Sequence, residues 1–463
     1  MKKKLLFLPL EIKTRELYSK IYFATKALNQ NYACFIGDKP GIFRATKYFN
    51  NGIYFYKSIN IPDTEHITQI KKNNNKYVVL DEEGGFTLLK DKDIKDFIHH
   101  RSSKTNVSLI DRFFNWGSFD YNHYIRLYPK FKKKFLITGG LRFEICQKSI
   151  IKKVYNDQIN SIKSQYGTNY ILLISSHGVT SLRELKKMFK SDIYYMKLKT
   201  KKQKQNRYAV LNELYKLNID FKKLITSIIK NFPNQKFIIR PHPSENIKDW
   251  NEFLLKKLKD QKNLSIDVEN DLNALIFNSN GIISSKSGAS IQALLQKKPI
   301  ITYSPNFIKH EFRLPDYLGY ISKSKKEVIK NLKKIIINKF SSPKKMNMLR
   351  KHVNNFNTKL KPSSIILKNL KLVYKSKSNI NTLVILLLSP IYFLFDFIFS
   401  KFKLRYHKKN ELVYRTQAEK MSKEGIKKQE IISIINNLQK NNSIKVLSFG
   451  KNCFFLYKKT LKN

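Results

Sequence analysis

Three short polar segments contain the residue types that acid–base and phosphate chemistry require. The segment RPHP at 240–243 directly follows apolar residues 237–239, so His242 stands between two prolines at the end of an expected strand. Proline fixes its own φ angle and has no N–H, so the turn that presents His242 is stiff. A histidine held in this way can act on a departing phosphate, and Arg240 can neutralise negative charge beside it. The alternative is that the two prolines only end a strand.

The segment DEEGG at 81–85 also follows apolar residues, at 77–80. Carboxylates that crowd together favour protonation of one another, which makes one of them suitable as a general base. The glycines allow a substrate to come close to the backbone. A solvated acidic turn is the alternative interpretation.

The third segment, SSKSG at 284–288, lies between an expected strand at 281–283 and an expected helix at 289–296. Serine hydroxyls and the backbone N–H groups at the start of a helix can hold a phosphate, and Lys286 adds positive charge. Ser287 could instead serve only as the N-cap of that helix. Each segment follows an expected strand, which is where open α/β sheets place their ligands.

Apolar runs alternate with amphipathic stretches along most of the chain. Strands are expected at 5–8, 32–36, 76–80, 107–110 and 135–137, with helices between several of them, and the alternation restarts with strands at 170–174, 237–239, 264–266, 281–284 and 299–303. This pattern predicts an α/β protein of GT-B architecture, with two Rossmann-like doubly wound domains facing each other across a cleft. The expected parts are an N-terminal acceptor domain at 1–140, a linker helix at 141–168 and a donor domain at 169–345.

Composition excludes several classes of protein. The 463 residues include 42% hydrophobic residues, enough for real cores, and only three cysteines without CxxC spacing, which suits a reducing compartment and argues against a zinc site. The net charge of +55 reflects lysines spread along every segment, as compositional drift would produce. Such a surface also attracts polyanions. No zinc-finger, RNP or basic-zipper pattern is present, so an anionic membrane surface is a better partner than nucleic acid.

The chain changes character near its C-terminus. Residues 346–405 are expected to form a linker with an apolar segment at 380–399, and residues 406–463 a small module of one helix and one hairpin. The apolar segment is long enough to cross a bilayer, yet it contains a Ser-Pro pair and Asp396 and has basic residues on both sides. We expect it to be seated in the membrane surface; a buried helix and a true span are the alternatives.

The order of the three motifs, acidic-acidic-Gly, His-Pro and Ser-Ser, resembles that of bacterial sialyltransferases, polysialyltransferases and capsule Kdo transferases. The opening FLPLEIKTREL at 7–17 and TGGLRF at 138–143 also resemble a GT-B family of bacterial surface carbohydrate biosynthesis proteins. The resemblance covers about residues 1–340.

This resemblance implies specific roles. Glu83, beside Gly84, would be the general base, with Glu82 in reserve, and His242 would act on the departing phosphate. The donor nucleotide would be bound by Arg240, Ser284, Ser285, Lys286, Ser287 and Gly288, and the acceptor side would include Glu11 and Arg15. No metal and no cofactor are expected. The expected reaction is inverting transfer of a CMP-activated keto-sugar acid to a lipid-linked glycan at the cytoplasmic face of the inner membrane.

Other functions remain open on sequence alone. The form SSKSG is also similar to that of UDP-sugar GT-B enzymes, so a UDP-sugar transferase or epimerase is one alternative. A glycerophosphotransferase that consumes CDP-glycerol is another. A third is a membrane-bound assembly factor without catalytic activity.

Overall fold

The chain forms two α/β units. The computed structural model describes residues 2–82, 98–99, 101–195, 198–259, 261–285, 287–305, 314–339, 345–356, 358–374, 380–381, 385, 387, 391, 425–439 and 443–459. Unit 1 comprises Met1–Asp157 with Asn347–Asn463, and unit 2 comprises Gln158–Met346. Unit 1 is therefore built from two stretches of sequence that are separated by the whole of unit 2.

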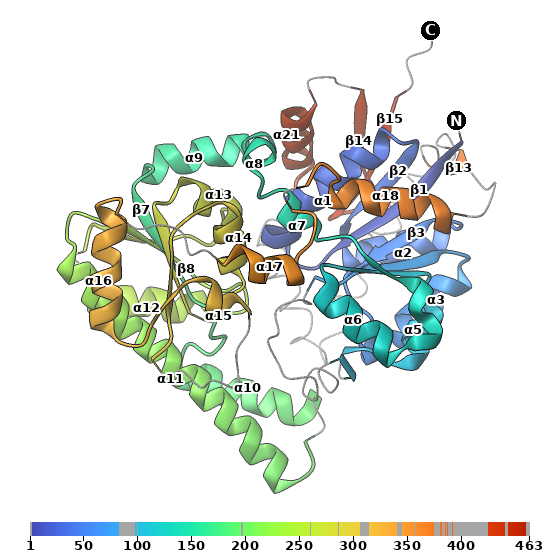
Figure 1. Ribbon diagram of the computed structural model, residues 1–463. Coiled ribbons are helices and arrows are strands. Elements are labelled where there is room, and N and C mark those ends of the chain that lie inside the picture. Colours follow the sequence, from blue (N-terminus) through green and yellow to red (C-terminus); the bar gives the residue numbers. More distant parts are fainter. Residues whose placement is uncertain are drawn as a thin grey trace. The chain divides into compact units, whose positions relative to one another are not determined.

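The sheet of unit 1 has a core of six parallel strands in the order β2-β1-β3-β4-β5-β6. Their bounds are β1 (Lys2–Leu10), β2 (Tyr32–Asp38), β3 (Ile53–Tyr56), β4 (Lys76–Leu80), β5 (Arg112–Asn115) and β6 (Phe135–Ile137). Helices lie on both faces of this sheet (Figure 1), which explains why its strands are apolar nearly throughout. The direction in which strands are added reverses between β1 and β3.

The helices of unit 1 follow the strands in the usual βα alternation. The first stretch of the chain supplies α1 (Lys13–Leu28), α2 (Lys39–Tyr48), α3 (Thr64–Lys72), α5 (Lys104–Leu109), α6 (Ser118–Leu127), α7 (Leu141–Glu144) and α8 (Lys148–Val154). The second stretch supplies α17 (Met346–His352), α18 (Pro362–Val373) and α21 (Lys428–Leu438), and short 3₁₀ turns are η1 (Ile61–Asp63) and η2 (Pro129–Lys134). Stacked aromatic rings, among them Phe7, Phe35, Tyr54 and Tyr77, fill the core on one face of the sheet.

The sheet of unit 2 has six parallel strands in the order β12-β11-β10-β7-β8-β9. The strands are β7 (Tyr170–Ile174), β8 (Lys236–Arg240), β9 (Leu264–Ile266), β10 (Gly281–Ser284), β11 (Ile300–Tyr303) and β12 (Tyr320–Ser322). The helices are α9 (Asn156–Tyr166), α10 (Leu182–Tyr195), α11 (Lys201–Asn231), α12 (Ile247–Lys257), α13 (Leu272–Asn278), α14 (Ala289–Leu295), α15 (Leu314–Leu318) and α16 (Lys325–Ile336). Here strand addition reverses between β7 and β10.

These topologies confirm the predicted fold class, an α/β protein of GT-B type with two Rossmann-like domains. One predicted strand is wrong. Residues 107–110 were expected to be extended, but Val107 lies in helix α5, and the strand is β5 at Arg112–Asn115. The side chain of Ser103 accepts a hydrogen bond from the backbone N–H of Asn106 and caps this helix, so the short apolar run forms a buried helical face instead.

The C-terminal helix and hairpin are present where the sequence predicted them, but they do not form a separate module. Strand β15 (Cys453–Lys458) pairs antiparallel with β2 and with β14 (Ile444–Ser448), so the hairpin extends the sheet of unit 1. The close approach depends on Gly37, where a Cβ atom would lie 2.1 Å from the backbone oxygen of Asn452. The C-terminal residues therefore complete unit 1.

Most of the apolar segment 380–399 lies outside the described residues. Its first two residues form strand β13 (Ile380–Asn381), which pairs antiparallel with the start of β1, and Ile385 is buried in the core of unit 1. Among the described residues no helix is both long enough and apolar enough to cross a bilayer.

Candidate functional site

The carboxyl ends of β7, β8 and β10 bring together the polar side chains of unit 2. His177 follows β7 and Ser285 follows β10, and the imidazole Nε2 of His177 lies 3.0 Å from the hydroxyl of Ser285. Both side chains are buried, at 1% and 2% exposure. This contact crosses the point where strand addition reverses, which is where open α/β sheets bind ligands.

Glu245 fixes the loops that carry these side chains. Its carboxylate is buried and accepts hydrogen bonds from the backbone N–H of His177 (2.8 Å), of Gly178 (3.2 Å) and of His242 (3.3 Å). It also accepts from the hydroxyl of Ser175, and from the indole N–H of Trp250 at 3.0 Å. One carboxylate thereby joins the loop after β7 to the loop after β8.

His242, predicted to act on a phosphate, lies on the second of these loops and is partly exposed. Its Nδ1 accepts a hydrogen bond from the backbone N–H of Ser244 at 3.2 Å and lies 2.7 Å from the hydroxyl of the same serine. Because Nδ1 is an acceptor, the neutral ring carries its proton on Nε2. His242 can therefore donate a hydrogen bond from Nε2 to an anionic group.

The predicted phosphate-binding serines differ in their contacts. The hydroxyl of Ser284 pairs with that of Ser290 at 3.0 Å, whereas Ser285 contacts His177. The hydroxyl of Ser287 accepts the backbone N–H of Ala289, the first residue of α14, at 3.3 Å, and Gly288 holds the N-cap position of this helix. Lys286 lies outside the described residues. Among the described residues of this segment, Ser285 is thus the serine that contacts a histidine, and the predicted phosphate contacts of Ser284 and Ser287 stay predictions.

Arg240 is committed to a different contact. Its guanidinium is 6% exposed, donates to the backbone oxygen of Asp267 at 2.9 Å and lies 3.5 Å from the carboxylate of the same residue. Burial lowers the pKa of Arg240, and the nearby carboxylate of Asp267 opposes that shift. Arg240 thus joins the ends of β8 and β9, and its predicted contact with a donor phosphate stays a prediction.

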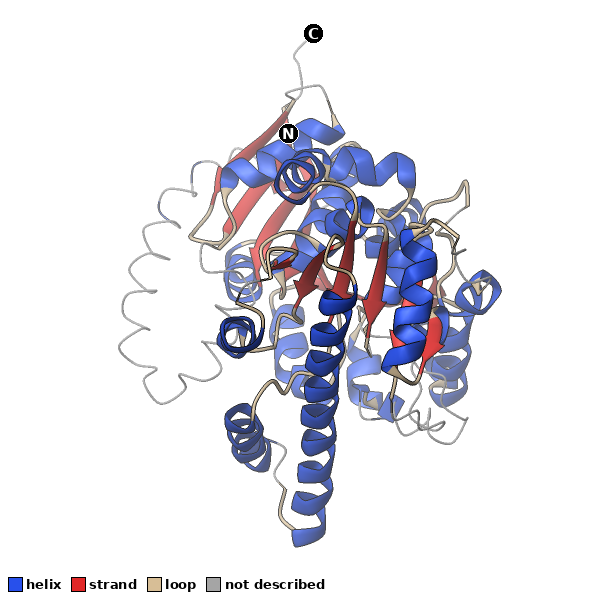
Figure 2. Cartoon of the chain, turned by 90° about the vertical axis from the view of Figure 1, so that its left-hand side faces the viewer, coloured by secondary structure: helices blue, strands red, loops and turns tan. Residues whose placement is uncertain are grey.

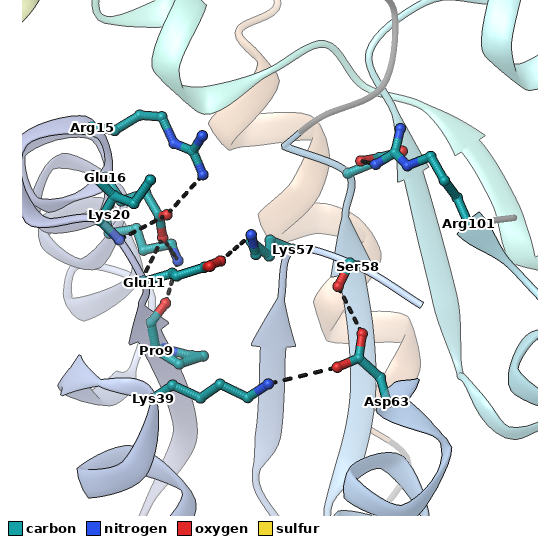
Figure 3. A network of polar contacts seen from close by, with 12 residues as sticks. Pro9, Glu11, Arg15, Glu16, Lys20, Lys39, Lys57, Ser58, Asp63 and Arg101 are labelled. Carbon is teal, nitrogen blue, oxygen red and sulfur yellow. Dashed lines mark hydrogen bonds and ion pairs between the residues drawn. The ribbon is translucent and has the colours of Figure 1, made fainter. Parts of the chain in front are cut away.

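Unit 1 has a second polar cluster, at the carboxyl ends of its own strands (Figure 3). Glu11 follows β1 and forms an ion pair with Lys57, which follows β3, so this contact also crosses a point where strand addition reverses. Arg15 contacts Glu16 at 3.4 Å. Glu11 and Arg15, which the resemblance placed on the acceptor side, are therefore held at this edge by ion pairs.

Glu16 organises the cluster. Its carboxylate accepts the backbone N–H groups of Glu11 and Ile12, both at 3.3 Å, and pairs with Lys20 at 2.9 Å. Burial alone would raise the pKa of Glu16, but the charges of Lys20 and Arg15 outweigh it and lower the pKa to about 2. Glu16 is therefore charged at neutral pH and accepts hydrogen bonds at the start of α1.

The reserve candidate for the base, Glu82, lies at the end of β4. Glu83 is outside the described residues, and Glu82, its reserve, is 5% exposed with its carboxylate 3.9 Å from Arg142. Burial raises the pKa of Glu82, and the charge of Arg142 opposes that rise. A carboxyl with a raised pKa at the end of a strand has the properties of a general base or acid.

Sequence reasoning missed Glu245 and His177. His177 follows the strand 170–174 just as His242 follows its own strand, so position after a strand could have identified it. Glu245 gives no such signal, because a single glutamate near a proline-rich turn looks like a surface residue. Among the residues that the structure describes, no group of three or more His, Cys, Asp or Glu side chains is arranged to hold a metal ion.

Comparisons with known proteins assign no family to this chain. No protein-family model matches it, and no curated protein sequence matches it significantly. Solved structures that are similar in backbone include a UDP-GlcNAc 2-epimerase from Methanocaldococcus jannaschii (15% identity, 80% of this chain and 100% of that chain, TM-score 0.46). Others are a putative UDP-N-acetylglucosamine 2-epimerase from Listeria monocytogenes (10%, 81% and 97%, 0.49) and the wall teichoic acid polymerase TagF (12%, 80% and 88%, 0.48). With every TM-score below 0.5, these similarities assign no activity.

Proposed function

We propose that the chain is a glycosyltransferase of bacterial surface polysaccharide biosynthesis that uses a nucleotide-activated sugar. The observation that carries the proposal is the assembly at the end of the second sheet, where His177, His242 and Ser285 come from three loops, two of them joined by Glu245. A buried carboxylate that fixes two histidine loops at the point of strand reversal is consistent with a preorganised anion-binding site.

The proposed reaction divides its tasks between the units. Unit 2 binds the nucleotide, and His242 donates from Nε2 to the departing phosphate while Ser285 and Ser287 donate from their hydroxyls. Unit 1 binds the acceptor, and a carboxylate of the acidic segment 81–83 removes the proton from the attacking hydroxyl. These roles need no metal ion, because hydrogen-bond donors can stabilise the leaving phosphate.

We propose CMP as the nucleotide. A CMP-activated sugar acid presents a single phosphate, which a few hydroxyls and one histidine can hold, whereas a diphosphate requires a longer cradle of donors. The segment 284–288 has serines and one lysine but no glycine-rich loop of the kind that wraps a pyrophosphate. The acceptor is proposed to be a lipid-linked glycan at the cytoplasmic membrane surface, which an unusually basic protein would approach readily.

A thermal-shift series with CMP, CDP, UDP and GDP tests the proposal. A nucleotide at about 100 times its Kd adds roughly 2.7 kcal/mol to the free energy of unfolding, so binding is readily detected. We expect CMP to stabilise the protein most, and His242→Ala and Ser285→Ala to abolish the shift. Ser265→Ala, on the edge strand β9, is the matched control and should keep it.

The outcomes separate the alternatives. Stabilisation by UDP at least equal to that by CMP would contradict the proposed CMP-linked donor. It would favour a UDP-sugar enzyme, including an epimerase that needs no acceptor. Stabilisation by CDP above CMP would favour a glycerophosphotransferase. If none of the four nucleotides shifts the unfolding transition, the enzymatic proposal fails and the non-catalytic alternative gains support.

A further inference from the structure

Asn115, the last residue of β5, has a buried side-chain amide without a hydrogen-bond partner. The residue is 1% exposed, and neither Nδ2 nor Oδ1 has a partner among the residues that the structure describes. A buried amide that has left water without gaining other hydrogen bonds destabilises the folded state, so native proteins rarely retain one without a reason.

Other buried asparagines of unit 1 show what a structural amide looks like in this fold. Asn106 is fully buried; its amide donates to the backbone oxygen of Asn60 at 2.8 Å and accepts from the hydroxyl of Thr64 at 2.7 Å. Asn75 is 1% exposed and accepts the backbone N–H of Gly52 at 2.7 Å. The fold thus supplies partners where an asparagine only supports structure, and Asn115 differs from both.

The position of Asn115 is that of a ligand-binding residue. Leu80 of β4 is paired with Phe114 of β5, so the next position along the edge sets Asp81 beside Asn115. Val79 and Phe113 pack in the same core cluster, and side chains alternate along a strand, so Asp81 and Asn115 lie on that same face of the sheet. Both residues are at the carboxyl end of parallel strands, the edge that binds ligands in α/β folds.

The neighbouring groups define the chemistry of a ligand. Asp81 is 5% exposed and paired with Arg101 at 2.6 Å, so a hydrogen-bond acceptor and a donor already stand beside the amide. The amide itself offers two donors and one acceptor. Neighbouring hydroxyl groups of a sugar, each of which both donates and accepts, match this set, whereas the carboxylate would repel a phosphate.

We propose that Asn115, with Asp81 beside it, binds hydroxyl groups of a neutral sugar in unit 1. The inference rests on the proposed function, because it gives the acceptor side of that enzyme a named residue and a class of substrate. Asn115 retains its amide at the expense of stability, since only the ligand completes its hydrogen bonds.

The same substitution at Asn115 and at Asn106 tests whether the amide of Asn115 has a hydrogen-bond partner in the ligand-free protein. Leucine has the same number and branching of side-chain heavy atoms as asparagine but no polar group. Asn115→Leu should leave the Tm of the ligand-free protein within about 2 °C of the wild type or raise it, whereas Asn106→Leu should lower the Tm by more than about 4 °C. If Asn115→Leu lowers the Tm as much as Asn106→Leu does, the amide has a structural partner such as an internal water, and the proposal is wrong.

Sugar binding is measured directly by saturation-transfer difference NMR with N-acetylglucosamine and galactose as probes, with and without CMP. Wild-type protein should transfer saturation to at least one probe, and Asn115→Leu should reduce that signal at least about tenfold while the CMP-induced thermal shift stays unchanged. Equal sugar signals from both proteins, or no signal from the wild type, would overturn the inference. Failure of every nucleotide to stabilise the wild type would instead contradict the proposed function, so the two failures are distinguishable.

Discussion

At the scale of single residues, the chain sets two neighbouring glutamates of unit 1 to opposite protonation behaviour. Glu16 and Glu82 are both buried, at 2% and 5% exposure. Glu16 has Lys20 at 2.9 Å and accepts two backbone N–H groups, so its charged form is favoured. Glu82 lies 3.9 Å from Arg142, and burial outweighs this charge and the weaker effects of Lys20 and Arg15, so its neutral form is favoured. Such a divergence between carboxyls commonly separates structural charges from catalytic ones.

The raised pKa of Glu82 predicts how stability depends on pH. A carboxyl whose pKa is higher in the folded than in the unfolded protein contributes stability below the unfolded value, and this contribution is lost as pH rises through the folded value. Glu82→Gln, which cannot ionise, should therefore remove a decline in the free energy of unfolding that begins near pH 4.5 and continues upward. Arg142→Met removes the opposing charge and should make the decline steeper and extend it to higher pH.

Urea unfolding between pH 4 and pH 8 measures this effect. Glu252 is the matched control, because it is an exposed glutamate with a weak surface pair to Lys256 at 3.9 Å. Glu252→Gln should leave the pH profile of the wild type unchanged. An unchanged profile in Glu82→Gln would show that Glu82 is already ionised in the folded protein at low pH and does not have the raised pKa of a proton-transfer group.

At the scale of elements, the sequence predicted those strands that have a strong local apolar pattern. The strands 170–174 and 237–239 are continuous apolar runs and 281–283 is a short one, and all three occur in the central part of the second sheet. The expected strand at 107–110 was wrongly assigned, because a run so short fits a buried helix as well as a strand. The pairing of β15 with β2 joins residues that are 416 to 422 positions apart, and no local signal encodes it.

The residues of the candidate site likewise fall into those that local sequence identified and those that depend on strand pairing. His242 and Ser285 were identifiable because each directly follows a strand. The role of Glu245 was not, because it depends on donors from two loops that become neighbours only when β7 pairs with β8. Likewise the involvement of Arg240 with Asp267 arises from the pairing of β8 with β9, which the sequence alone does not reveal.

The two loops joined by Glu245 should behave as one element. Glu245→Ala leaves several buried donors without an acceptor, each at a cost of about 1–3 kcal/mol, so the free energy of unfolding should fall by about 3 kcal/mol or more. Glu245→Gln keeps the shape and should fall less. In hydrogen exchange, the amides of His177, Gly178 and His242 should lose protection together in both variants, since all three donate to this carboxylate.

Glu252 lies within α12 and is exposed, so Glu252→Ala again serves as the control. It should change the free energy of unfolding by no more than about 0.5 kcal/mol. Loss of protection at only one of the two loops in Glu245→Gln would mean that they are stabilised separately. The account of a single carboxylate that positions both histidines would then be incorrect.

At the scale of the whole molecule, the net charge of +55 attracts any polyanion and identifies none. The position of the basic residues in the fold is more informative than their number. Helix α11 has 31 residues, but its buried residues begin only at Leu211, so its first ten residues extend beyond the core of unit 2 together with α10 (Figure 2). Residues 186–207 of this helical hairpin contain nine basic residues and one acidic residue. Tyr194 and Tyr208 are exposed there, at 77% and 43%.

A projecting basic hairpin with exposed tyrosines can approach an anionic bilayer closely, and tyrosine favours the membrane interface. For the proposed binding to a membrane surface, we therefore expect the hairpin to contribute most of the electrostatic affinity. Helix α16 provides a comparison, because it is equally rich in lysine but packs along its length through Val328, Leu332 and Ile335. Its lysines therefore lie along the body of unit 2 and do not project beyond its core.

Vesicle sedimentation of two charge-reversal variants tests whether membrane affinity comes from the projecting hairpin or from the net charge of the whole protein. One variant changes six exposed lysines of the hairpin to glutamate: Lys186, Lys187, Lys190, Lys199, Lys201 and Lys202. Its matched control changes six exposed lysines in or beside α16 to glutamate: Lys323, Lys325, Lys326, Lys330, Lys333 and Lys334. Each lysine near an anionic surface contributes about 1 kcal/mol, so the hairpin variant should lose at least about 100-fold in partitioning onto phosphatidylserine vesicles, and the control less than about tenfold. Equal losses in the two variants would show that the affinity follows net charge alone. High salt should weaken the wild type toward the level of the hairpin variant, because it screens charge while leaving apolar contacts intact.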